Sequence, residues 1–106
     1  MSKPQQELVK ESYLQEVALL FEVLRTCPTQ ESFKDLLKDL LTVSEMRMLK
    51  RRWHIARLLG RGYDVRLVAK EAGVSTGTVM QIKKTLVRGR GGLTRALGRV
   101  RDSQLG

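Results

Sequence analysis

Gln81 and Lys84 end a stretch of the chain whose residue types and spacing suit contact with double-stranded DNA. A glutamine amide can pair bidentately with adenine, so Gln81 is the strongest candidate for a sequence-specific contact. A lysine ammonium, as at Lys84, more readily binds a phosphate, which positions a protein without reading sequence. The chemistry that this stretch predicts is recognition of a nucleic acid.

The other candidates are expected on the outer face of the same helix or on the helix before it. Thr76 and Thr78 offer hydroxyl and methyl groups to phosphate or base, and Gly77 permits close approach of the backbone. Arg88 and Arg90 could extend the phosphate contacts or enter a neighbouring minor groove as a flexible arm. Simple solvation is the alternative for each lysine and arginine. The predicted DNA-binding set is Lys70, Ser75, Thr76, Gly77, Thr78, Met80, Gln81, Lys83, Lys84 and Arg88.

A helix-turn-helix over residues 64–86 would position these side chains. Ala69 is small where two helices cross, and Gly73, four residues later, can take the positive φ that ends the first helix. Asp64 and Ser75 are the expected N-caps of the two helices. An ordinary corner between two helices uses the same spacing and is the alternative interpretation. The residues expected to fill the angle between the helices are Val68, Ala72, Val74, Val79 and Ile82.

The distribution of charge favours DNA over that alternative. The formal net charge is +9, but residues 1–40 hold 5 basic and 7 acidic residues, a net charge of −2. Residues 41–106 hold 15 basic and 4 acidic residues, a net charge of +11. A positive surface of this kind binds polyanions by releasing their counterions.

Composition excludes several other classes of protein. The chain of 106 residues supports one domain. It contains no apolar run near the roughly 20 residues needed to span a bilayer, and its N-terminal residues lack the pattern of a secretory signal. A single cysteine, Cys27, and a single histidine, His54, give no nucleophile–base pair and no metal framework. We therefore expect no enzyme, no catalytic residue, no cofactor and no metal, and a cytoplasmic, nucleoid-associated location.

The first predicted helix runs from about Gln6 to about Arg25 and is apolar on more than one face. A helix of this kind needs burial on several sides, which points to a partner subunit, so residues 1–26 are the expected dimerisation helix. A central helix wrapped by its own chain is the alternative. Residues 26–29, with Pro28, break the helix.

Residues 29–62 are the expected core helices. The second helix places Phe33, Leu36, Leu37, Leu40 and Leu41 on one face, a pattern that predicts core packing. Thr42 and Glu45 form the pattern of a capping box that begins the third helix, and residues 60–62 end it. The glycine- and arginine-rich segment 89–106, beyond a single all-α domain over 1–88, is expected to be a short helix over 93–100 or a tail.

The order Leu41-Thr42-x-x-Glu45, then Arg52, then Leu58-Leu59-x-Arg61-Gly62, then the helix-turn-helix with Gly73 and Thr78-Val79, resembles the Trp repressor family. The similarity is greatest to its Trp-repressor-like YerC/YecD branch. It covers about Phe33 to Leu86, with the first helix similar in character only. The resemblance implies an all-α, Trp-repressor-like fold and a dimer with intertwined N-terminal helices.

In the family, two arginines enclose the corepressor L-tryptophan. Arg52 matches the first, whereas the second falls on Ile82 and a serine one turn later falls on Leu86. The resemblance therefore implies DNA binding with L-tryptophan an unlikely effector, and Trp53 is a core or pocket-wall aromatic.

The leading hypothesis is a dimeric, repressor-like transcriptional regulator that binds palindromic operator DNA. A nucleic-acid-binding accessory or nucleoid protein without a regulatory role is one alternative. A helical adaptor for other proteins, whose helix-turn-helix is only a corner, is another.

Overall fold

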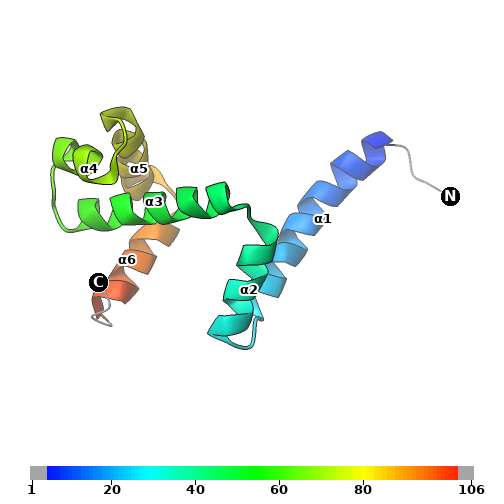
Figure 1. Cartoon of the computed structure of the whole chain (residues 1–106). Coiled ribbons are helices and arrows are strands. Elements are labelled where there is room, and N and C mark those ends of the chain that lie inside the picture. The colour runs from blue at the N-terminus through cyan, green and yellow to red at the C-terminus, as the bar shows by residue number, and fades with distance from the viewer. Residues whose placement is uncertain (1–4, 103–106) are drawn as a thin grey trace. The chain divides into compact units, whose positions relative to one another are not determined.

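The computed structural model describes the backbone of residues 5–102 and the side chains of residues 12–100. This part of the chain is all helical, as predicted, and contains no strand (Figure 1). The helices are α1 (Gln5–Arg25), α2 (Gln30–Leu40), α3 (Val43–Gly60), α4 (Val65–Ala72), α5 (Thr76–Arg88) and α6 (Gly92–Asp102). None of them is long and apolar enough to cross a membrane.

The chain divides into two compact units, unit 1 (Met1–Val43) and unit 2 (Ser44–Gly106). Unit 1 contains α1 and α2, and unit 2 contains nearly all of α3 together with α4, α5 and α6. The single domain over residues 1–88 stays a prediction.

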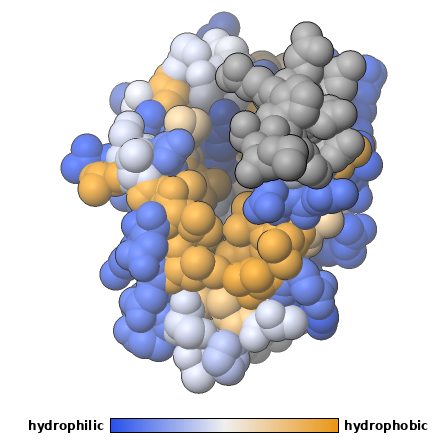
Figure 2. Space-filling model, turned by 90° about the vertical axis from the view of Figure 1, so that its right-hand side faces the viewer, coloured by the Kyte–Doolittle hydropathy of each residue, from blue (hydrophilic) through white to orange (hydrophobic). Residues whose placement is uncertain are grey.

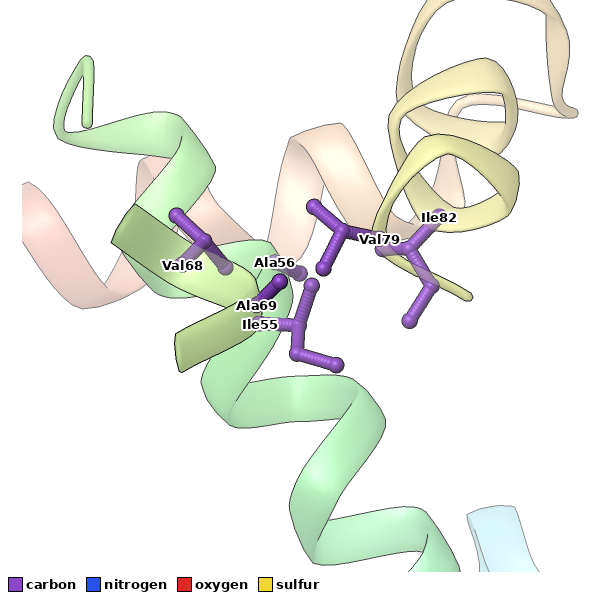
Figure 3. Packing of buried hydrophobic residues seen from close by; sticks show 6 residues of the cluster. All are labelled: Ile55, Ala56, Val68, Ala69, Val79 and Ile82. Carbon is purple, nitrogen blue, oxygen red and sulfur yellow. The ribbon is translucent and has the colours of Figure 1, made fainter. Parts of the chain in front are cut away.

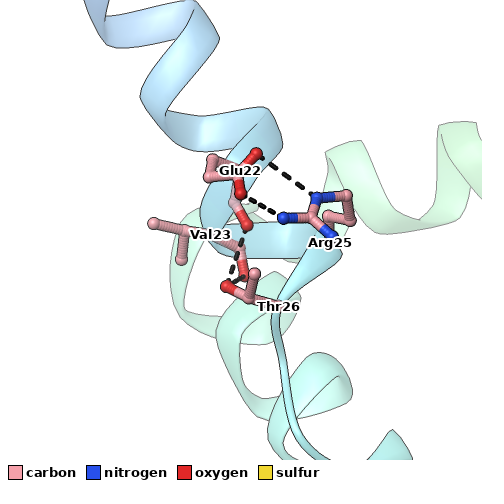
Figure 4. A network of polar contacts seen from close by, with 4 residues as sticks. All are labelled: Glu22, Val23, Arg25 and Thr26. Carbon is pink, nitrogen blue, oxygen red and sulfur yellow. Dashed lines mark hydrogen bonds and ion pairs between the residues drawn. The ribbon is translucent and has the colours of Figure 1, made fainter.

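The connection between α1 and α2 is fixed by local hydrogen bonds. The Thr26 hydroxyl donates to the Glu22 carbonyl oxygen at 2.9 Å, and Arg25 donates to the Glu22 carboxylate (Figure 4). The Thr29 hydroxyl accepts from the Ser32 N–H at 3.1 Å, and Ser32 Oγ accepts from the Thr29 N–H at 3.2 Å. This capping box begins α2 directly after the predicted break.

The expected core packing of α2 is not found among the described residues of unit 1. No side chain in the described part of unit 1, residues 12–43, is buried. Tyr13 is 68% exposed, Leu14 72% and Phe21 64%. Two helices alone present too little surface to cover both of their apolar faces. Figure 2 shows apolar side chains gathered at the molecular surface between hydrophilic margins.

Unit 2 has a small apolar core where α3, α4 and α5 meet. Its buried side chains point toward one another from the three helices (Figure 3). Leu93 and Leu97 of α6 pack against this cluster, and Leu97 lies so close to Gly60 that a Cβ there would meet its Cδ1 at 3.3 Å. The buried residues are Ile55, Ala56, Val68, Ala69, Val79 and Ile82.

The two ends of α3 match the predicted signals. The helix begins at Val43, directly after Thr42. At the other end Gly62 has φ +91°, its N–H donates to the Leu59 carbonyl at 3.0 Å, and the Tyr63 N–H donates to the Leu58 carbonyl at 3.3 Å. This pair of bonds is a Schellman motif, which satisfies carbonyl groups left open at a helix end.

Candidate nucleic-acid interface

The segment predicted as a helix-turn-helix consists of two helices, α4 and α5, joined by a short turn, which is consistent with that prediction. Asp64 caps α4 and accepts from the Arg66 N–H at 2.6 Å. Gly73 has φ +68°, and its N–H donates to the Lys70 carbonyl at 3.3 Å. The Val74 N–H donates to the Ala69 carbonyl at 3.0 Å, which completes a second Schellman motif. Gly73 therefore ends α4 in the left-handed conformation expected of it.

Ser75 is the N-cap of α5. Its Oγ accepts from the Thr78 N–H at 3.2 Å and lies 3.1 Å from the Thr78 hydroxyl. The two side chains are thus engaged with each other at the start of the helix. Ser75 was predicted both as a cap and as part of the DNA-binding set, and the structure provides the cap.

α5 has a buried face and an opposite, exposed one. Val79 is fully buried and Ile82 is 8% exposed, and Leu86 follows on the same face, half-buried. This spacing of three and four residues marks one side of a helix. The four residues on the opposite side share the same kind of spacing; this recognition face consists of Gly77, Gln81, Lys84 and Arg88.

Every residue of the predicted DNA-binding set is exposed. Thr76, Met80 and Lys83 flank the recognition face on one side, at spacings of four and three residues. Met80 is 50% exposed, an apolar group suited to a thymine methyl. Lys70 lies on α4 and is also exposed.

Gly77 leaves the recognition face open. A Cβ at this position would meet only the Ser75 Oγ, at 3.7 Å, an ordinary van der Waals distance. The fold therefore does not require glycine here. A ligand whose surface comes close to the backbone here would favour glycine, because a side chain would stand in its way.

In the part of the chain that the structure describes, the cationic side chains of α4 and α5 have no acidic partners. Within the described residues, Lys70, Lys83, Lys84 and Arg88 form no ion pair. Their charges are consequently available to phosphate groups.

Arg66 was missed by the sequence analysis. It is exposed and lies one turn before Lys70, so the two share one side of α4. The spacing of four residues between two basic side chains was the signal that could have found it.

The segment between α5 and α6 is a fixed turn. The Gly89 N–H donates to the Thr85 carbonyl at 2.7 Å, and Gly91 has φ +87°. The Thr94 hydroxyl of α6 donates to the Leu86 carbonyl at 3.2 Å. Arg88 and Arg90 therefore flank a hydrogen-bonded turn at the end of α5, and their contacts with phosphate or as a minor-groove arm stay predictions. The short helix expected over 93–100 is present as α6.

A shallow pocket of about 220 Å³ lies on unit 2 away from the recognition face of α5. It is lined by Leu58, Tyr63, Leu67, Val68 and Glu71. Within the described residues, no group of three histidine, cysteine or acidic side chains is placed to hold a metal ion.

The two positions that match the family's tryptophan-enclosing arginines, Arg52 and Ile82, lie in different environments. Arg52 is exposed, whereas Ile82 belongs to the buried core. A charged side chain that binds a ligand needs an exposed position. Ile82 is buried, and the exposed position beside it is Gln81. Neither Ile82 nor Gln81 is an arginine, and L-tryptophan as an unlikely effector stays a prediction.

Three comparisons relate this geometry to known proteins. The family model described as Trp repressor protein matches residues 15–101. The uncharacterized protein YerC of Bacillus subtilis (strain 168) is 29% identical over 89 residues, covering 84% of this chain and 86% of YerC. A crystal structure of a "putative Trp repressor" from Staphylococcus aureus superposes with a TM-score of 0.71 at 29% identity, covering 93% of this chain and 96% of the other.

Proposed function

Because the chain belongs to the Trp repressor family, we propose that it is a transcriptional regulator that binds palindromic operator DNA as a homodimer. In this proposal α5 enters the major groove and α4 braces it against the phosphate backbone. The function requires no catalytic residue, cofactor or metal, and it places the protein in the cytoplasm, on the nucleoid.

The observation that carries the proposal is the recognition face of α5. It combines an amide that can read adenine, Gln81, with an open backbone at Gly77 and two cations, Lys84 and Arg88, that form no ion pair with any residue the structure describes. A corner that served only to pack two helices would need the buried Val79 and Ile82 but none of these exposed groups. The face therefore favours DNA binding over an adaptor role.

The dimer rests on the exposed apolar side chains of α1. Soluble monomers seldom expose large contiguous apolar patches, and such patches mark interaction sites. Tyr13, Leu14 and Phe21 are each more than half exposed, and burying one large apolar side chain contributes about 1.5–3 kcal/mol. A second copy of α1 is the proposed cover, in keeping with the intertwined N-terminal helices that the family resemblance implies.

Selection of bound sequences from a random DNA pool at physiological salt tests the proposal. We expect a palindromic consensus whose half-sites lie about one helical turn, 10–10.5 base pairs, apart. If no sequence were enriched, the proposal of sequence-specific DNA binding would be contradicted.

A second candidate function, a sequence-indifferent nucleoid protein, is favoured by the net charge of +11 on residues 41–106. It would bind all duplexes with similar affinity, and that affinity would fall steeply with salt. The same selection separates the two functions.

A further inference from the structure

Basic side chains recur along one side of α3 and just beyond its end. They are Arg47, Lys50, His54, Arg57 and Arg61, called here the α3 stripe. Their spacings of three, four, three and four residues place them on one face of a helix. Arg47, Lys50 and Arg61 are exposed, and His54 and Arg57 are half-buried.

The α3 stripe and the recognition face of α5 point to different sides of unit 2. Ile55 and Ala56 of α3 point into the core, where they meet Val79 and Ile82 of α5 (Figure 3). The α3 stripe lies on the side of α3 opposite its two core residues, and the recognition face lies on the side of α5 opposite its own. A duplex seated on α5 therefore leaves the α3 stripe uncovered.

The α3 stripe destabilises the isolated helix. Like charges three and four residues apart on a helix repel, by about 0.2–0.5 kcal/mol for each pair, and such pairs here are Arg47 with Lys50 and Arg57 with Arg61. The only acidic residue of α3, Glu45, lies two residues from Arg47, on another face of the helix. Within the described residues none of the basic groups of the α3 stripe forms an ion pair. An external polyanion would turn this repulsion into attraction.

The apolar surface of α3 lies on the other side of the helix. Met48 and Leu49, 47% and 48% exposed, precede Ile55 and Ala56 by seven residues each and so continue the core face. A protein partner that covers these apolar groups leaves the α3 stripe in solvent.

We propose that the α3 stripe binds the phosphate backbone of a second DNA duplex, so that one protein bridges two segments of DNA. This inference rests on the proposed function, since the first duplex is the one held by α5. The α3 stripe offers four cations and the imidazole of His54 but no amide or hydroxyl, and contacts between its cations and phosphates carry no sequence information. It extends over about 21 Å at 1.5 Å per residue, enough to follow several phosphates of one strand.

A two-duplex capture assay with the full chain tests the inference. A biotinylated duplex with the selected consensus is held on beads, and a fluorescent duplex of unrelated sequence is added in solution. Wild-type protein is compared with Arg47→Ala/Lys50→Ala and with a control, Lys34→Ala/Lys38→Ala, which removes two cations from the polar side of α2. Capture is measured between about 50 and 200 mM salt.

We expect the α3 stripe variant to bind the first duplex as wild type does but to capture at least about fivefold less of the second. Loss of two phosphate contacts should also lower the slope of log affinity on log salt for the second duplex by about 1.8. The control should behave as wild type. Thermal unfolding should occur at no lower temperature in the variant, because the substitutions remove repulsion.

Equal capture of the second duplex by wild type and the α3 stripe variant would overturn the inference, since the two copies of α5 would then hold both duplexes. An equal loss in the control, or a change in the variant's oligomeric state, would overturn it too. Failure of wild type to bind the first duplex would instead refute the proposed function.

Discussion

At the scale of single residues, exposure separates the two faces of α5 along its whole length. Val79 and Ile82 are buried while Gln81 and Lys84 are exposed, as the sequence analysis predicts. The helical period alone suffices for this assignment, because each buried residue determines the side on which its neighbours lie. The capping bond, in which the Thr78 N–H donates to Ser75 Oγ, was likewise predictable, since N-caps have a residue preference. The hydrogen bond from the Thr85 hydroxyl to the Gln81 carbonyl, at 3.2 Å, was not, since threonine inside a helix has several options.

Gly77→Ala separates DNA contact from folding. The added methyl group meets only Ser75 Oγ, at 3.7 Å, and alanine is the better helix former by up to about 1 kcal/mol. We expect thermal unfolding at an equal or higher temperature, but weaker binding to the selected duplex, because the methyl group stands where the backbone approaches DNA. Gly98→Ala on α6, where a Cβ meets nothing within 4 Å, is the control and should leave affinity unchanged. Unchanged affinity in Gly77→Ala would show that DNA does not approach this backbone.

Ser75 can be tested in its two roles at once. Ser75→Ala removes the cap and should lower the free energy of unfolding by about 1 kcal/mol, measured by urea denaturation. Ser75→Asp keeps an N-cap acceptor and should retain most of the stability, yet its negative charge should weaken DNA binding. If Ser75→Asp bound DNA as tightly as wild type, the start of α5 would lie away from the phosphates.

At the scale of helices, several of the residues that begin and end helices were predictable, and the longer-range contacts were not. Gly73 ends α4 and Asp64 begins it because few residue types suit those backbone positions. The capping box of α2 escaped notice because Ser32 takes the place usually held by glutamate or glutamine. The bond from Thr94 to Leu86 joins two helices across a turn, and a single sequence contains no periodic signal for such a contact.

At the scale of the whole molecule, the apolar character of α1 was evident from its sequence, but the burial of α2 was misjudged. Leu40, on the predicted core face of α2, is 51% exposed within one chain. An apolar stripe shows that a face needs cover, not whether the cover comes from the same chain or another. The proposed homodimer would cover the exposed apolar side chains of both α1 and α2.

Phe21→Glu tests the dimer. Phe21 is 64% exposed, so in an isolated chain the substitution would cost little. In a dimer it places a charge in an apolar interface, and we expect the mass measured by light scattering to fall from two chains to one. Glu16→Gln, also exposed on α1, is the control and should remain dimeric. A wild-type protein that is monomeric at micromolar concentration would contradict the proposed dimer.

The central claim, that the recognition face of α5 reads DNA, is tested most directly by the affinity of Gln81→Ala. Fluorescence anisotropy would compare wild type and variant on the selected consensus and on a scrambled duplex at one salt concentration. We expect the variant to lose about 1–3 kcal/mol of binding free energy on the consensus, roughly 5–150-fold, and almost none on the scrambled duplex. Equal affinities of the two proteins for the consensus would contradict the claim.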